Sequence, residues 1–287
     1  MLKQSSQYRR YTRSRAGNVA YFTLLVLMGV FSVLPLIYCV VTSFKPIDEL
    51  LIFPPRFFVR NPTLSNYFAL PTLLSNIQVP LSRYIFNSVF VAIAGTALHI
   101  IAASLAAFTF SKSGTRGAAL SFAVVEMMLL YNSVTLGVPQ YFIFSKLHIL
   151  DSYWAYILPA IPSSVGCFLM KQFMVNVPDT ILEAARIDGA GEQRIFWRIV
   201  MPSVKAAWMT LIIFSFQNLW GQTGGNTIYS EALKTLPYAL SQAVTAGISR
   251  TGESAAISML MMTVPIAVFI ITQSNVMETM MSSGIKE

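Results

Sequence analysis

Residues 180–202 read TILEAARIDGAGEQRIFWRIVMP, the most charged segment of an otherwise apolar chain. Six ionisable side chains lie in it: Glu183, Arg186, Asp188, Glu192, Arg194 and Arg198. Helices that face lipid do not accommodate that many charges, so this segment must lie outside a bilayer. The long apolar runs on both sides of it must then form the membrane-embedded part of the fold.

The same segment predicts two short helices joined at glycine. Thr180 and Glu183 have the spacing of a capping box. An apolar stripe at helical spacing follows at Ile181, Leu182 and Ala185. Gly189 and Gly191 provide a stop, because glycine tolerates the left-handed conformation that ends many helices. A second stripe, which we expect to end before Pro202, consists of Ile195, Phe196, Ile199 and Val200.

Composition indicates an integral membrane protein. Hydrophobic residues make up 55% of the 287 and charged residues only 11%, against about 25% charged in ordinary soluble domains. The net charge of +8 does not indicate nucleic-acid binding, because the basic residues lie in short gaps between apolar runs. Cys39 and Cys167 fall inside such runs, which is more typical of packing residues than of a disulfide or a metal pair.

The apolar runs predict an all-α integral membrane protein with six transmembrane helices. We expect a basic tail over 1–18 and spans over about 19–42, 84–110, 118–144, 152–170, 206–226 and 254–276. The first run is longer than a signal-peptide core and no small-residue cleavage site follows, so we expect it to be retained. The fifth run is clearly apolar only to Trp220, so it must continue through 221–226 or break there.

Charge sets the expected orientation. With the N-terminus inside, the inner segments hold 13 basic residues and the outer segments hold 7. This asymmetry favours cytoplasmic termini and a cytoplasmic element at 176–204, with external loops at 43–83 and 227–252.

Interrupted spans and polar groups within them identify a candidate solute pathway. Segments 159–166 and 217–226 are interrupted, and broken backbone is tolerated where it lines a cavity, although prolines can also kink helices for packing. Glu126 either lines the pathway, is protonated, or pairs with another chain at an interface. We expect His99 to be a structural residue facing another helix. The pathway candidates are Glu126, Asn132, Gln217, Asn218, Trp220 and Gln222.

The sequence contains no motif for binding or hydrolysing ATP. No phosphate-binding loop, Rossmann glycine pattern, H-E-x-x-H or G-x-S-x-G occurs. We therefore expect no catalytic residue, no metal and no cofactor bound by this chain. The small residues of 184–190, framed by charges, would allow a partner's backbone to approach closely. The alternative is an amphipathic segment lying on lipid headgroups.

Glu183-Ala184-Ala185, then Gly189, then Ile199 to Pro202 closely resemble the EAA motif of binding-protein-dependent ABC importer permeases, with Met201 at the usual Leu. In that family the pattern is E-A-A, three residues, G, nine residues, I-x-L-P. The string is similar to the carbohydrate-uptake branch, typified by the smaller permease subunit of the maltose system. Over most of residues 40–287 there are further matches at Pro55, Asn61-Pro62-Thr63, Arg83-Tyr84-x-x-Asn87-Ser88, Leu150-Asp151-x-Tyr153, 168–173 and 284–287. Residues 220–225 depart from the pattern by having more glycines.

This resemblance implies the ABC-importer permease fold in a bacterial cytoplasmic membrane. It implies that a coupling helix fits into a groove of an ATPase subunit, with site residues Glu183, Ala184, Ala185, Arg186, Asp188, Gly189, Ile199 and Pro202. It also implies a second homologous permease, two ATPase subunits that hold ATP and Mg²⁺, and an extracytoplasmic solute-binding protein, which 226–252 would contact. The implied cargo is a sugar or oligosaccharide.

Two alternatives remain open from the residues. One is an importer permease for another polar solute, such as a peptide or a polyamine. The other is an ion-coupled secondary transporter that uses Glu126 as its proton site.

Overall fold

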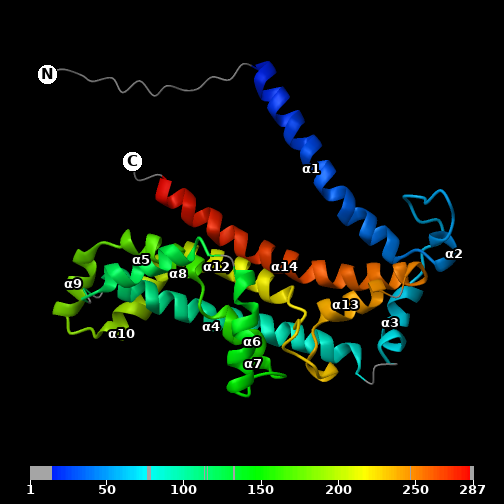
Figure 1. Cartoon of the computed structure of the whole chain (residues 1–287). Helices are drawn as coiled ribbons and strands as arrows, with labels where there is room; N and C mark the ends of the chain where they lie inside the picture. Colours follow the sequence, from blue (N-terminus) through cyan, green and yellow to red (C-terminus); the bar gives the residue numbers. More distant parts are fainter. Residues whose placement is uncertain are drawn as a thin grey trace.

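The computed structural model describes residues 15–75, 79–112, 114, 116–131, 133–245 and 247–284, and every regular element among them is helical (Figure 1). The α-helices are α1 (Arg15–Ser43), α2 (Ile47–Leu50), α3 (Ser65–Ser75), α4 (Leu81–Lys112), α5 (Ala118–Met128), α6 (Gly137–Lys146), α7 (Tyr153–Ile157), α8 (Ser164–Val175), α9 (Asp179–Ile187), α10 (Glu192–Ile195), α11 (Met201–Ser203), α12 (Lys205–Trp220), α13 (Leu236–Thr245) and α14 (Thr251–Gly284). The η elements are η1 (Ser133–Leu136), η2 (Leu158–Ala160), η3 (Phe196–Val200), η4 (Glu231–Leu233) and η5 (Ile248–Arg250).

Three of the described helices are long and apolar enough to cross a membrane: Gly17–Ser43 of α1, the whole of α4, and Thr251–Gln273 of α14. Two bent pairs meet the same length and composition if each pair counts as one span. The first joins Tyr153–Ala160 to Ser164–Val175 at 44°, and the second joins Glu192–Ser203 to Lys205–Trp220 at 80°. The chain is therefore a helical membrane protein with up to five spans among its described residues.

Helix α4 is the centre of the fold, and α12 and α8 pack along it. Its buried positions recur at spacings of three and four and include small residues such as Ala92, Gly95 and Ala103. Small side chains let neighbouring membrane helices approach closely. At Gly95 the approach is tight, since a Cβ there would lie 2.5 Å from Leu219 Cδ1 of α12.

Two hydrophobic clusters lie at the two ends of α4. The first gathers Tyr84 and Val91 of α4 with Leu219 and Trp220 of α12 and Ile257 of α14. The second gathers the other end of α4 with α8 to α12 and contains Ala107, Phe108, Met170, Met174, Leu182, Ile195, Phe196, Val200 and Leu211. In Figure 1, α9 and α10 cover one end of α4, whereas α3 and α13 lie toward the other.

Helix α1 packs on α14 and carries much exposed apolar surface. Its N-terminal part extends away from the other helices (Figure 1), and Phe22 and Phe31 are 68% and 77% exposed. A continuous apolar surface of this kind needs lipid or a partner helix to cover it.

The spans expected at 118–144 and 206–226 are each interrupted. The first divides into α5, which ends at Met128, and α6, which follows η1. The second breaks after Trp220, where Gly221 caps α12, so the fifth apolar run does not continue through 221–226 as helix. The expected interruption at 159–166 is confirmed, and the Ser163 hydroxyl accepts the Gly166 N–H at the start of α8.

Candidate functional site

The α9–α10 element lies where the charged segment predicts a helix–glycine–helix. The expected capping box is wrong: α9 begins at Asp179, its N-cap is Pro178, and no side chain caps it. Proline fixes φ at a value that suits a helix entrance, so the helix starts before Thr180 can act as the cap. The glycine stop is confirmed, because Gly189 has φ +80°.

Gly189 closes α9 in a Schellman motif. The Ala190 N–H donates to the Ala185 carbonyl at 2.9 Å, and the Gly189 N–H donates to the Arg186 carbonyl at 3.0 Å. These two bonds satisfy carbonyls that the end of a helix otherwise leaves unpaired. The glycine is required here by its backbone angle and not by space, since a Cβ at this position meets nothing within 4 Å.

The two faces of α9 differ in burial. Leu182 is 1% exposed and belongs to the cluster at that end of α4, and Ala185 is partly buried. Ile181, expected on the same stripe, is 49% exposed. Glu183 and Ile187 face outward, and Ile187 is 87% exposed. Ala184, Asp188 and Gly189 are also exposed, so the motif presents a small-residue surface with an apolar tip.

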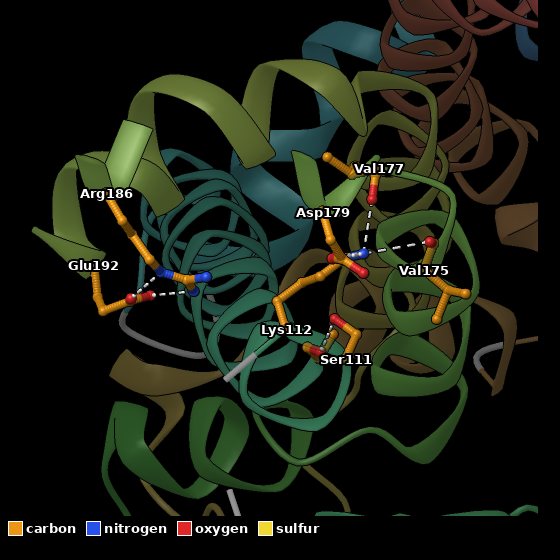
Figure 2. A network of polar contacts seen from close by, with 8 residues as sticks. Ser111, Lys112, Val175, Val177, Asp179, Arg186 and Glu192 are labelled. Atoms are coloured by element: carbon orange, nitrogen blue, oxygen red, sulfur yellow. Dashed lines mark hydrogen bonds and ion pairs between the residues drawn. The ribbon is translucent and has the colours of Figure 1, made fainter. Parts of the chain in front are cut away.

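Two ionic contacts hold this element in place (Figure 2). Lys112, the last residue of α4, donates to the carbonyls of Val175 and Val177 at 3.4 and 2.7 Å and pairs with Asp179 at 2.7 Å. Arg186 donates through Nε and Nη2 to the Glu192 carboxylate at 2.9 and 3.5 Å, across the glycine turn. This hydrogen bonding raises the pKa of Arg186. Arg186 therefore fixes α9 to α10 within the chain.

The second helix is anchored by its apolar stripe. Ile195, Phe196 and Val200 are buried, and Ile199 is partly buried, as the stripe predicts. The helix does not end before Pro202: a π-helical turn over η3 carries it through α11 to Ser203. Proline lacks an N–H, and local π-turns are one way in which a helix accommodates such a missing bond.

The pathway candidates on and after α12 do not share one environment. Gln217, Asn218 and Gln222 are exposed, and Gln222 Nε2 donates to Asn218 Oδ1 at 3.2 Å. Trp220 is only 3% exposed, and its indole N–H donates to the Met261 carbonyl of α14 at 2.9 Å. In this conformation the Trp220 ring fixes α12 to α14, so it offers no aromatic face to a solute.

The described polar residues of the other apolar runs, Glu126 and His99, do not form a shared site with those on α12. Glu126 is exposed on α5, and none of the ion pairs among the described residues includes it. Asn132 lies outside the described residues. His99 is 4% exposed, its Nδ1 is 2.9 Å from the Ala160 carbonyl, and a Cβ at Gly166 would lie 2.7 Å from its ring. His99 therefore has the structural role expected of it.

At the other end of α4, the Arg83-Tyr84-x-x-Asn87-Ser88 motif holds residues 231–236 by hydrogen bonds. Asn87 Nδ2 donates to the carbonyls of Ala232 and Lys234 at 2.9 and 2.7 Å. Arg83 Nε also reaches the Ala232 carbonyl, at 3.2 Å. Ser88 Oγ accepts the Leu236 N–H at 2.8 Å. Residues 231–236 are thus held along α4 by the Arg83-Tyr84-x-x-Asn87-Ser88 motif.

Asp151 holds the residues just before that segment. Its carboxylate accepts the N–H groups of Tyr229 and Ser230 at 2.9 and 2.8 Å and the Ser230 hydroxyl, and its own N–H donates to the Thr227 carbonyl. Burial alone would raise the pKa of Asp151, but the bonds from Ser230 and Tyr229 hold it below the ordinary value. Tyr153 joins the two motifs, since its hydroxyl donates to Asn87 Oδ1 at 2.7 Å.

A cavity of about 920 Å³ opens between α6 and this fixed segment. The described residues that line it are Gly137, Val138, Gln140, Tyr141, Phe142, Gly225, Asn226, Thr227, Ile228, Tyr229, Lys234 and Tyr238. Its aromatic rings and amides can contact a polar organic molecule. Sequence patterns did not reveal this cavity or the outward Ile187. The exposure of Ile187 could have been predicted from its helical spacing, because it shares a face with Thr180 and Glu183 and lies opposite Leu182.

Comparison with known proteins places the fold. No family model matches the chain. It is 30% identical over 209 residues to the polygalacturonan/rhamnogalacturonan transport system permease protein YtcP of Bacillus subtilis, covering 72% of this chain and 70% of YtcP. It is 32% identical over 219 residues to the sulfoquinovosyl glycerol transport system permease protein SmoH of Agrobacterium fabrum, covering 75% and 74%.

A solved structure has the same fold. A chain of a bacterial ABC transporter involved in the import of the acidic polysaccharide alginate superposes with a TM-score of 0.77 at 20% identity, covering 91% of this chain and 98% of that one. The sequence similarity to YtcP and SmoH extends over more than two thirds of each relative. The chain therefore belongs to the family of ABC transport system permeases.

Proposed function

We propose that the chain is a membrane-spanning permease subunit of an ATP-driven importer of sugars or oligosaccharides, and that α9 docks it onto a separate ATPase. The outer face of α9 carries this proposal. Ile187 is 87% exposed beside the exposed Glu183 and Ala184, on a helix whose inner face is anchored by Leu182. Burying such an isoleucine against a partner contributes about 1.5–3 kcal/mol, so the surface fits a docking site.

The length of α4 is consistent with a membrane lying between α9 at one end and residues 231–236 at the other. From Asn87, which holds that segment, to Lys112, which holds α9, the helix rises roughly 38 Å. This exceeds the hydrocarbon thickness of about 30 Å, so its ends fit opposite sides of the bilayer. The basic residues favour the cytoplasm for α9 and for both termini, in a protein with six spans.

A carbohydrate cargo is supported by the named cargoes of YtcP and SmoH. The exposed amides of Gln217, Asn218 and Gln222 would offer hydrogen bonds along the pathway. Glu126 stays a candidate for the pathway or for an interface with another chain. Trp220 would act by supporting α12 from inside the fold.

The proposed assembly supplies what this chain lacks. Two ATPase subunits would hold ATP and Mg²⁺, with no cofactor on the permease itself. A second permease would cover apolar faces such as that of α5, where Leu120 and Met127 are 75% and 71% exposed. A solute-binding protein would deliver the sugar from outside the bacterial cytoplasmic membrane.

Co-purification tests the docking surface. Ile187→Glu places a charge at the tip of α9 without disturbing a buried contact. We expect ATPase retained by the purified permease pair to fall by at least about tenfold, because the affinity loses the burial of an isoleucine. Leu64→Glu is a matched control, since Leu64 is 51% exposed and directly precedes α3, which lies toward the other end of α4 (Figure 1).

The controls for this experiment are membrane insertion and pairing with the second permease, both of which should be unchanged in Ile187→Glu. Full ATPase retention together with normal ATP-dependent uptake in this variant would overturn the docking role of α9. Equal loss in Leu64→Glu would show a general effect of the added charge.

A further inference from the structure

Lys234 is a buried cation at the wall of the cavity beside α6. It is 7% exposed, and its Nζ lies 4.4 Å from the centre of the Tyr238 ring. Among the described residues, no ion pair or hydrogen bond engages this ammonium group. A lysine is rarely this buried without a partner, because its charge loses hydration.

The nearby carboxylates are already engaged by other donors. Glu231 accepts the hydroxyls of Tyr84 and Tyr238 at 3.2 and 2.9 Å. Asp151 accepts from Tyr229 and Ser230, as described above. Neither acid lines the cavity, and Lys234 is the charged residue among the described lining residues. Lys234 is thus the charged side chain that the described lining presents to the cavity, and its charge also helps to lower the pKa of nearby Asp151.

The rest of the wall suits a sugar ring. Tyr141 and Tyr229 come from two different segments, and their hydroxyls lie 3.0 Å apart. Gln140 and Asn226 add amide groups to the lining. Aromatic rings with a few amides and one charge form a binding site for a polar molecule with an apolar face and one anionic group.

The wall is also fixed before any ligand arrives. Asp151 holds the backbone of Tyr229, and Asn87 holds the backbone of Lys234, from two other parts of the chain. A site whose supporting residues are held in this way loses little conformational entropy on binding.

We propose that this cavity binds an anionic sugar, whose carboxylate accepts hydrogen bonds from Lys234 and whose rings lie against Tyr141 and Tyr229. The proposal rests on the sugar-permease function proposed above and specifies its cargo as a sugar acid. A charged hydrogen bond of this kind is worth about tenfold or more in affinity.

Calorimetry on the purified permease–ATPase complex in nanodiscs tests this site with two probes. One is trigalacturonate, and the other is the same trisaccharide with its carboxyl groups reduced to alcohols. Lys234→Met keeps the length of the side chain and removes its charge, and Lys234→Arg keeps the charge. Lys146→Gln is the control, because Lys146 is an exposed lysine at the end of α6 that does not line the cavity.

We expect trigalacturonate to bind the wild-type complex and Lys146→Gln equally, Lys234→Arg within about threefold, and Lys234→Met at least about tenfold more weakly. The reduced trisaccharide should bind weakly and should not distinguish Lys234→Met from wild type. Retention of the ATPase by Lys234→Met shows that the variant is folded.

Three outcomes would overturn the proposal: no binding of trigalacturonate to wild type, equal binding by Lys234→Met, or equal wild-type affinity for the reduced trisaccharide. Loss of the second permease or of the binding protein from Lys234→Met would assign the lysine to a protein contact and would equally overturn it. None of these outcomes touches the docking of α9, which Ile187→Glu tests separately.

Discussion

Lys112 and Asp179 form a 2.7 Å ion pair that joins the last residue of α4 to the first residue of α9, and the two sides are unequally buried. The lysine side chain is 4% exposed, whereas the aspartate side chain is 74% exposed. The lysine also binds the carbonyls of Val175, the last residue of α8, and Val177, two residues further on (Figure 2). The ammonium group is thus the element that joins α4, α8 and α9.

Lys112→Met should therefore destabilise the protein more than Asp179→Asn does. Loss of the charged donor leaves the carbonyl of the buried Val177 without this partner and should lower the free energy of unfolding by about 1.5–3 kcal/mol. Loss of the exposed carboxylate should cost less than about 1 kcal/mol, because solvent screens it. Unfolding in detergent measures both, and equal effects would contradict the central role of the lysine.

Gly189→Ala should destabilise α9, whereas Gly191→Ala should not. Gly189 has φ +80°, where alanine costs roughly 1–2 kcal/mol. Gly191 has φ −71°, and neither glycine has an atom within 4 Å of an added Cβ. Hydrogen exchange at the Ala190 N–H, which closes the Schellman motif, reports the difference. Equal protection in the two variants would exclude the backbone angle as the cause.

Asn87→Ala should release the segment that forms the cavity wall. Asn87 is fully buried and supplies both donors to the carbonyls of Ala232 and Lys234. The Lys234 carbonyl would lose this donor and the Tyr153 hydroxyl would lose its acceptor, whereas the Ala232 carbonyl would keep Arg83 Nε. We therefore expect a loss of about 2–4 kcal/mol in unfolding free energy and faster exchange over 231–236. Asn176→Ala is the control, since its bond to the Gln172 carbonyl is exposed and should matter little.

Acidification should loosen the same wall through Asp151. The pKa of Asp151 is lower in the folded state than the ordinary value of about 3.8. The carboxylate therefore stabilises the fold fully above that ordinary pKa, and this stabilisation is lost as the pH falls through the folded-state pKa. Exchange protection of the Tyr229 and Ser230 N–H groups, corrected for intrinsic pH dependence, should fall in that acidic range. Asp151→Asn should remove this pH dependence, and an unchanged profile would assign it to another group.

Local pattern was sufficient to predict most of the α9–α10 element. Gly189 indicates a helix end through its own backbone freedom, and Leu182 and Ile195 lie on stripes set by neighbours three or four residues away. The same reasoning failed at Thr180, because Pro178 starts the helix earlier. It also placed Ile181 on the buried face, although tertiary packing leaves it half exposed.

Contacts between distant residues could not be predicted in this way. Asn87 and Lys234 are 147 residues apart, and no periodicity connects them. Trp220 lies beside glycines and amides in the sequence, which suggested a solute pathway. Its indole N–H instead donates to the Met261 carbonyl, 41 residues further along the chain. The cavity depends on such pairs throughout, so it became visible only once the helices were assembled.

Helix α4 contains no proline over its 32 residues, unlike α1 and α14. Lys112 attaches α9 at one end of it, and Asn87 attaches the cavity wall near the other. It can therefore act as a lever arm. A rotation of about 10° about the Lys112 end would displace Asn87, roughly 38 Å away along the helix, by roughly 6–7 Å. A small tilt of α4 that accompanies a movement of α9 would therefore shift the cavity wall at Lys234 on the far side of the protein.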